Sequence, residues 1–355
     1  MLSRLAVFFF MLLAIIGWLS CGHRTHATHP AYVTVPVSNH VVGFNIDNKS
    51  GSLSVMSKSP FVTGNGPSSL TVHPSKKFAY VANAVDATIA LYTIGTSNEL
   101  TEVPPRIATG ANPLGLTVDP SGSFLFVANA GSNSVSVYSI SSTGSLSEIS
   151  GSPFPTTSPL ALALSPSGKF LYVANATSGR ISVYAIQSTG ALSGGVSFAA
   201  GPNPSSIAID PGGHFLYVTN ETSTTFTGFT IDSASGALTV MPGSPFTAGT
   251  NPSAAAFDTS GKFLYIANLA SNNLSAFTID AASGLPTQIS GSPFSAGTAP
   301  LFLAVDPVGT FLFVGNQSSN NISGFTINSS TGVLTATSPA TTGTGSAPTS
   351  MFIPK

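Results

Sequence analysis

Four ionisable residues, His40, Asp86, Arg180 and Glu221, stand where a recurring and otherwise uncharged sequence pattern is interrupted. Charge is scarce in this chain, because only 6% of its 355 residues are Asp, Glu, Lys or Arg. A carboxylate such as that of Glu221 could act as a general base, and the guanidinium of Arg180 could stabilise a developing oxyanion. Whether these groups can act together depends on the elements that hold them.

The recurring pattern is an apolar run that ends in Asn, as in "FLYVANATSGRISVY" from Phe170. We interpret this regular Asn as a turn cap, with a ligand as the alternative. The position after it reads Pro36, Ala84, Ala130, Ala176, Glu221, Leu269 and Gln317 along the chain. Two positions later Asp86 replaces a serine, and two beyond that His40 and Arg180 replace Thr, Ser or Asn. The fold does not demand these exceptions, so we predict Arg180 and Glu221 as catalytic residues and His40 and Asp86 as ligand-binding residues.

The pattern belongs to a longer repeat whose copies are aligned by a proline. The aligned prolines stand 45 to 48 residues apart, at Pro67, Pro113, Pro159, Pro204, Pro252, Pro300 and Pro348. Each copy predicts four strands, named A to D, over 205–210, 214–220, 225–232 and 237–241 in the copy from Pro204. This period is typical of a β-propeller blade, so we predict an all-β, seven-bladed β-propeller of four-stranded blades.

The two ends of the repeat array complement each other. The array opens with a B strand from Ala31 and finishes with an A strand, "PTSMFIPK", from Pro348. We therefore expect Ser350–Ile353 to pair with Tyr32–Val35, so that the C-terminal strand completes the first blade. Closure of the ring would remove two exposed sheet edges.

Propeller sites usually lie at the mouth of the channel formed by the B–C and D–A loops, by analogy with other propellers. Arg180 and Glu221 then belong to neighbouring blades, four and five, whereas His40 and Asp86 belong to blades one and two. The simpler interpretation of Arg180 and Glu221 is an exposed ion pair, and such pairs contribute only about 0–1 kcal/mol. Both interpretations stay open at this point.

The N-terminal segment predicts export. Arg4 precedes an apolar run from Leu5 to Leu19, which is short for a membrane-spanning helix. Cys21 follows at once in a lipobox-like context, so we predict a signal peptide over 1–21 with lipidation at Cys21, a tether over 22–30 and the propeller over 31–355. The protein would be exported and lipid-anchored in the bacterial cell envelope, at the outer membrane or in the periplasm of a Gram-negative host. Plain secretion and an uncleaved anchor are the alternatives.

Composition argues against several partners and cofactors. The net charge is −1, so no broad field would attract nucleic acid, and contact with a membrane would occur only through the N-terminal lipid. The chain has no Gly-rich phosphate loop and no Cys/His metal spacing. We therefore expect no cofactor and no metal.

The Tyr-Val-Ala-Asn and Tyr-Val-Thr-Asn repeats and the Asn220-Glu221 pair resemble the lactonase-like seven-bladed propellers, over residues 31–355. That family includes 6-phosphogluconolactonases and carboxymuconate-cyclising enzymes. The resemblance implies a catalytic rim of one His, one Glu and two Arg, to which Glu221 and Arg180 correspond. The positions of the family's His and second Arg carry Leu160-Ala161-Leu162 and Leu269 instead.

This partial match leads to two functional hypotheses. The first is an exported lactonase-like propeller with a degenerate rim site, which binds a small polar ligand or an envelope protein without catalysis. The alternative is a lactone hydrolase for an unphosphorylated lactone or sugar acid, with Glu221 as base and Arg180 as oxyanion partner. The missing His and Arg favour the first hypothesis, and they argue against a phosphorylated substrate.

Overall fold

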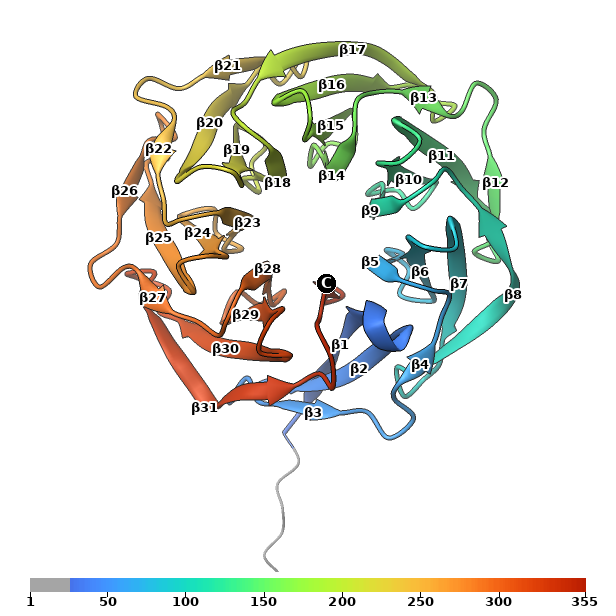
Figure 1. The fold of residues 1–355 in the computed structure, drawn as a ribbon, viewed down its shortest axis with the longest axis horizontal. Helices are drawn as coiled ribbons and strands as arrows, with labels where there is room; N and C mark the ends of the chain where they lie inside the picture. Colours follow the sequence, from blue (N-terminus) through green and yellow to red (C-terminus); the bar gives the residue numbers. More distant parts are fainter. Residues whose placement is uncertain (1–25) are drawn as a thin grey trace, which may run out of the picture.

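The computed structural model describes residues 26–355, which form seven β-sheets arranged around a central channel (Figure 1). The sheets stand radially, with strand A next to the channel and strand D at the periphery. The predicted all-β, seven-bladed propeller is confirmed. We number the blades from the N-terminus, and we call the face with the B–C and D–A loops the upper face.

The two inner strands of each blade are regular and short. Strand A is β5 (Pro67–Val72), β9 (Pro113–Val118), β14 (Pro159–Leu164), β18 (Pro204–Ile209), β23 (Pro252–Phe257), β28 (Pro300–Val305) and β32 (Ser350–Phe352). Strand B is β6 (Phe78–Asn83), β10 (Phe124–Asn129), β15 (Phe170–Asn175), β19 (Phe215–Asn220), β24 (Phe263–Asn268), β29 (Phe311–Asn316) and, in blade 1, β1 (Thr28–Val35).

The outer strands vary more. Strand C is β2 (His40–Asp47), β7 (Thr88–Ile94), β11 (Ser134–Ile140), β16 (Arg180–Ile186), β20 (Thr225–Ile231), β25 (Asn273–Ile279) and β30 (Asn321–Ile327). Strand D is β3 (Leu53–Val55), β8 (Leu100–Ala108), β12 (Leu146–Glu148), β17 (Leu192–Ala199), β21 (Leu238–Val240), β26 (Pro286–Gln288) and β31 (Leu334–Gly343). Four blades add a two-residue strand beside strand C, namely β4 (Phe61–Val62), β13 (Phe154–Pro155), β22 (Phe246–Thr247) and β27 (Phe294–Ser295). One 3-10 helix, η1 (Pro36–Ser38), forms the B–C loop of blade 1.

The ring closes as the complementary ends predict. β32 pairs antiparallel with β1, with Tyr32 opposite Phe352 and Thr34 opposite Ser350. The hydroxyl of Thr34 hydrogen-bonds those of Thr349 and Ser350 at 2.9 and 3.1 Å. β1 begins at Thr28, inside the segment expected as a tether, because Thr28–Pro30 pair with Asn45–Asp47.

The hydrophobic core is divided among the blade interfaces. Seven clusters of buried side chains are present, and each combines residues of two adjacent blades. Buried tyrosines of strand B add a polar contact across the same interfaces. Tyr80, for example, donates to the carbonyl of Gly144 in the next blade at 2.8 Å. Because every blade packs on two others, the ring acts as one structural unit that fixes the upper-face loops relative to one another.

Aspartates on the lower face have structural tasks. Asp119, Asp210, Asp258 and Asp306 are buried in the A–B turns. The carboxylate of Asp210, for example, accepts from the backbone N–H groups of His214 and Phe215 at 2.7 and 2.6 Å. These carboxylates close their own turns.

The expected signal peptide and Cys21 lie outside the described residues. Within 26–355 no helix is long and apolar enough to cross a membrane.

Candidate functional site

The regular Asn that ends strand B joins three segments of its blade. Asn129 accepts from the hydroxyl of Thr109 in the preceding D–A loop at 3.1 Å and donates to that of Ser136 in strand C at 2.9 Å. Asn83, Asn175, Asn268 and Asn316 make equivalent pairs of contacts. These five Asn residues are therefore structural, and they fix the start of the B–C loop in blades 2, 3, 4, 6 and 7.

Glu221 follows Asn220 at the end of β19 and is half-buried on the upper face. Its backbone N–H donates to the carbonyl of Asn203 at 3.0 Å, and its carboxylate accepts from the side-chain amide of Asn203 at 3.1 Å. None of the ion pairs within residues 26–355 includes Glu221. Burial raises the pKa of Glu221, and the hydrogen bond from Asn203 opposes this rise only in part.

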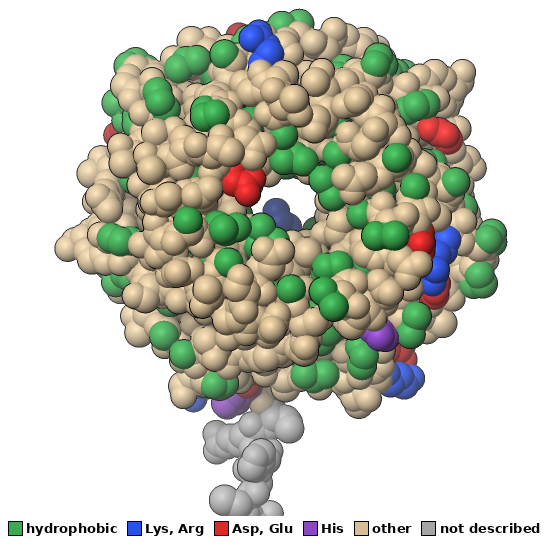
Figure 2. All heavy atoms as spheres, in the orientation of Figure 1, with side chains coloured by type: hydrophobic (Ala, Val, Ile, Leu, Met, Phe, Trp, Pro, Cys, Tyr) green, Lys and Arg blue, Asp and Glu red, His purple; other side chains and the backbone are tan. Residues whose placement is uncertain are grey.

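Arg180 lies at the start of β16, one blade away, and its side chain is exposed. Its guanidinium donates to the carbonyl of Ser197 in β17, the outermost strand of the same blade, at 2.8 Å. The structure therefore does not bring Arg180 and Glu221 into direct contact. In the view of the upper face an acidic side chain lies at the edge of the channel, whereas Lys and Arg side chains lie toward the periphery or deeper in the channel (Figure 2).

A shallow hollow lies between the loop that precedes Arg180 and the loop that carries Asn203, the hydrogen-bond partner of Glu221. It has a volume of about 620 Å³ and is lined by the B–C loop of blade 4 (176–179) and by the loop that leads to blade 5 (Ala199, Gly201, Pro202 and Asn203). Asn203 thus borders the hollow and holds the carboxylate of Glu221. Neither Arg180 nor Glu221 lines the hollow itself.

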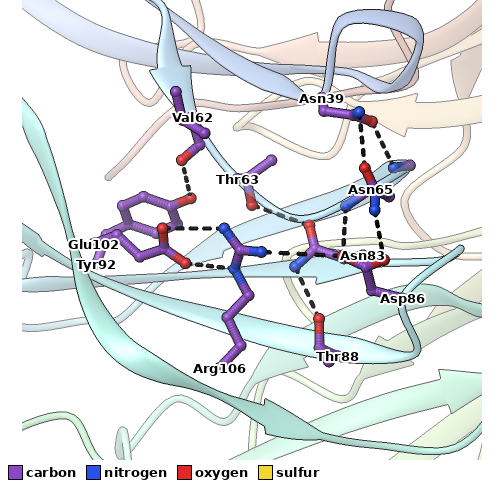
Figure 3. Close-up of polar contacts among 11 residues, drawn as sticks. Asn39, Val62, Thr63, Asn65, Asn83, Asp86, Thr88, Tyr92, Glu102 and Arg106 are labelled. Carbon is purple, nitrogen blue, oxygen red and sulfur yellow. Dashed lines mark hydrogen bonds and ion pairs between the residues drawn. The ribbon is translucent and has the colours of Figure 1, made fainter.

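Asp86 has a different environment, which Figure 3 shows. Its carboxylate accepts from the backbone N–H and the side-chain amide of Asn65 at 2.7 and 2.8 Å, and the guanidinium of Arg106 lies 4.0 Å away. The Asn65 hydrogen bonds, and secondarily Arg106, lower the pKa of Asp86. The groups that surround Asp86 in this structure therefore hold it as a structural anion.

Arg106 is a charged residue of this face that the repeat comparison missed. It donates to both carboxylate oxygens of Glu102, at 2.6 and 3.2 Å, while it approaches Asp86 (Figure 3). Ile107 pairs with Ile89 as Phe154 pairs with Val135, so Arg106 stands at the position of Pro153 in the recurring Ser-Pro-Phe segment. A comparison of that column would have revealed Arg106 as a cation in place of an apolar side chain.

His40 begins β2 and pairs with Val35 and Val62. It is half-buried, and its Nδ1 atom is buried without a hydrogen-bond partner. The neighbouring Asn39 donates to Asn65 at 2.9 Å, and Asn65 in turn binds Asp86. His40 and Asp86 therefore belong to one region of blades 1 and 2, away from Glu221.

A larger cavity, about 820 Å³, occupies the lower part of the channel and is lined by the inner strands and the A–B turns. None of the four predicted site residues lines it. Among the residues that the structure describes, no three His, Cys, Asp or Glu side chains are grouped so that they could hold a metal ion. The upper mouth around Glu221 is thus the candidate site.

The fold and the sequence match a known family. The sequence model described as "Lactonase, 7-bladed beta-propeller" matches residues 22–161, 153–245 and 239–348. The chain belongs to this lactonase family. No curated protein matched the sequence significantly.

Solved structures share the fold along almost their whole length. A candidate 6-phosphogluconolactonase from Bacteroides fragilis has a TM-score of 0.82 at 21% identity, over 93% of this chain and 98% of its own. The periplasmic gluconolactonase PpgL of Pseudomonas aeruginosa has a TM-score of 0.78 at 21% identity, over 93% of this chain and 99% of its own. At this identity the likeness shows the fold alone.

Proposed function

We propose that the protein hydrolyses an unphosphorylated lactone at the upper mouth of the channel, with Glu221 as the general base. The observation that carries this proposal is a half-buried carboxylate, Glu221, with one side-chain partner, Asn203, and burial raises its pKa. A carboxylate with a raised pKa is a stronger base near neutral pH than a solvated one. Membership of the lactonase family supports the reaction class.

The reaction needs one group that both takes and returns a proton. Glu221 accepts a proton from water as the water oxygen attacks the acyl carbon of the lactone. The ring C–O bond of the resulting tetrahedral intermediate then breaks, and the protonated Glu221 returns the proton to the leaving alkoxide. The product is a hydroxy acid, which ionises and releases one proton to solvent. This route needs no histidine at Leu160 or Leu162.

The surrounding charges favour a substrate without a phosphate. Arg106 already binds Glu102 and approaches Asp86, and Arg180 donates to Ser197 in the outermost strand. A phosphate is usually held by more than one cation or donor. PpgL, whose fold is similar, is named as a gluconolactonase rather than as an enzyme of a phosphorylated sugar.

Proton release from a panel of unphosphorylated lactones tests the proposal, with the wild-type protein and Glu221→Gln measured side by side. We expect turnover by the wild type and its loss in Glu221→Gln at an unchanged circular dichroism spectrum. Equal rates for the two proteins, or no hydrolysis of any lactone by the wild type, would contradict the proposal.

Binding without catalysis is the second candidate. It is favoured by the position of Arg180, whose guanidinium points to β17 and so supplies no oxyanion donor beside Glu221. In that case a small polar ligand or an envelope protein would bind at the same mouth. Calorimetric binding of an intact lactone, together with the absence of proton release, would identify this candidate.

We also propose that the protein is exported and anchored by a lipid on Cys21. The apolar run followed by Cys21 supports this proposal, as does the similarity to a periplasmic protein. Cys21→Ala should release the protein from membranes, and mass spectrometry of the mature protein should show lipid on Cys21. A mature protein that still contains Met1 would contradict the proposal.

A further inference from the structure

The residue after each aligned proline determines whether adjacent blades are joined by a side-chain hydrogen bond near the mouth of the channel. In four blades this residue is Ser68, Ser205, Ser253 or Thr349, and its hydroxyl donates to the carbonyl of the aligned proline in the next blade. The distances for Ser68 and Ser253 are 2.6 and 2.7 Å. Three blades break this pattern with Leu114, Leu160 and Leu301.

A β-bulge directs these side chains toward the neighbouring blade. In blade 5, Pro204 pairs with Asn220 and Ser206 pairs with Thr219, so Ser205 is left out of the register. Blade 4 has the same irregularity, with Pro159 paired with Asn175 and Ala161 with Ala174, so Leu160 is the residue left out. A bulge re-aims the side chain of its extra residue. By this equivalence, the Leu160 side chain faces Pro204.

Pro204 directly follows Asn203, which holds the carboxylate of Glu221. Leu160 therefore faces the base of the loop that positions Glu221. Leu160 is half-exposed and belongs to none of the seven core clusters, whereas Leu301 packs against the cluster between blades 7 and 1. Leu160 thus offers apolar surface at the mouth that the core does not use.

A second leucine flanks Glu221 on the opposite side. Leu269 follows Asn268 in blade 6 at the position that Glu221 occupies in blade 5, and its backbone N–H makes the equivalent bond to Asn251, at 2.8 Å. Leu269 is also half-exposed. Hydrophobic side chains lie beside the acidic one at the channel mouth in Figure 2. The base therefore lies between blades that each present a leucine.

We propose that this site selects lactones that carry an apolar substituent, which Leu160 and Leu269 contact while Glu221 acts on the ring. This inference rests on the proposed hydrolysis at Glu221 and adds the substrate class. The transfer of an alkyl chain from water to the surface of leucine side chains is favourable, because it removes apolar area from water. The hydroxyls of a sugar lactone would instead lose hydrogen bonds to water without new partners on that surface.

The test compares kcat/KM for δ-decalactone and δ-gluconolactone, with unsubstituted δ-valerolactone as a probe of the hydrolysis itself. We expect the wild type to favour δ-decalactone over δ-gluconolactone by at least about tenfold, because one methylene group in an apolar pocket typically changes kcat/KM by tenfold or more. Leu160→Ser, which introduces the residue of the other blades, should lower this preference about tenfold. Leu301→Ser is the matched control across the ring and should keep the wild-type preference.

A wild-type preference for δ-gluconolactone would overturn the proposal, as would an unchanged ratio of the two kcat/KM values in Leu160→Ser. In either case, turnover of δ-valerolactone would leave the proposed hydrolysis at Glu221 intact. If no lactone is hydrolysed, the proposed function fails, and calorimetric binding of δ-decalactone and δ-gluconolactone to the wild type then decides the selectivity. Weaker binding of δ-decalactone would overturn the proposal. Leu160→Ile, which keeps the apolar character, should retain the wild-type ratio and replaces Leu160→Ser if the serine variant does not fold.

Discussion

Asp86 and Glu221 are two carboxylates in equivalent loops of the same face, yet their environments shift their pKa values in opposite directions. Asp86 accepts two hydrogen bonds from Asn65 and lies 4.0 Å from the guanidinium of Arg106, so its pKa is lowered. Glu221 accepts one side-chain hydrogen bond, from Asn203, and burial raises its pKa. Both residues interrupt the repeat, but only Glu221 has a raised pKa, which suits a general base.

The difference arises from the segments around each residue rather than from the carboxylates themselves. In blade 2 the D strand carries Arg106 at a position that aligns with Pro153, Pro245 and Pro293 of other blades. In blade 5 the corresponding segment carries Phe246, which packs against the core between blades 5 and 6. A departure from a repeat therefore indicates a candidate site only when neighbouring donors and cations do not already neutralise it.

The largest expected effect concerns turnover. Glu221→Gln should lower kcat for lactone hydrolysis by about 10²- to 10⁴-fold, which is the usual contribution of a general base. Asp86→Asn should leave kcat within about twofold, because Asp86 is held in a separate network. Steady-state kinetics of both variants measure the contrast. A comparable loss of kcat in the two variants would show that Asp86 is as important for turnover as Glu221, and so would contradict its structural assignment.

Unfolding in urea should show the reverse contrast. Asp86→Ala should lower the free energy of unfolding by about 0.5–1.5 kcal/mol, because it removes the acceptor of two exposed hydrogen bonds from Asn65 and a charge near Arg106. Glu221→Gln should not lower it, since the glutamine carbonyl can still accept from Asn203. If Asp86→Ala unfolds at the same urea concentration as the wild type, the network around Asn65 is not stabilising.

The two carboxylates should also give opposite dependences on pH. Because the folded-state pKa of Glu221 is raised, kcat/KM should fall below a midpoint that lies above the ordinary value of 4.5. The favourable contribution of Asp86 to stability is present above its ordinary pKa of 3.8 and is lost as the pH falls through its lowered folded value. Thermal unfolding of wild type and Asp86→Asn should therefore converge at low pH. An acid limb of kcat/KM at or below 4.5 would contradict the assignment of Glu221.

Arg180 should show the smallest effect. Its guanidinium is exposed and bonded to Ser197, so Arg180→Gln should change kcat/KM by no more than about twofold, and stability by about 0–1 kcal/mol. The family resemblance instead implies an oxyanion role, for which a loss of about 10²-fold is typical. A loss of that size would show that the side chain turns toward Glu221 during the reaction.

Much of the fold could be predicted because a propeller repeats one local solution. Pro-aligned copies of 45 to 48 residues predicted the blades, and the complementary ends predicted the pairing of β32 with β1. The exceptions at Glu221 and Asp86 were also visible as breaks in the repeat. Arg106 was missed because its column, the Ser-Pro-Phe segment, was regarded as purely apolar.

What the sequence determined by itself is the number of blades, the closure of the ring and the positions on the upper face that depart from the repeat. These features depend on strand period and on local turn residues, which are encoded within each copy. Only the tertiary structure decided which carboxylate keeps a raised pKa and where Arg180 points. The partners of Asp86 and Glu221 come from Asn65, Arg106 and Asn203, about 20 residues away along the chain. Burial and charge at a side chain depend on distances between such separate segments, and these distances are set when the loops pack around the channel.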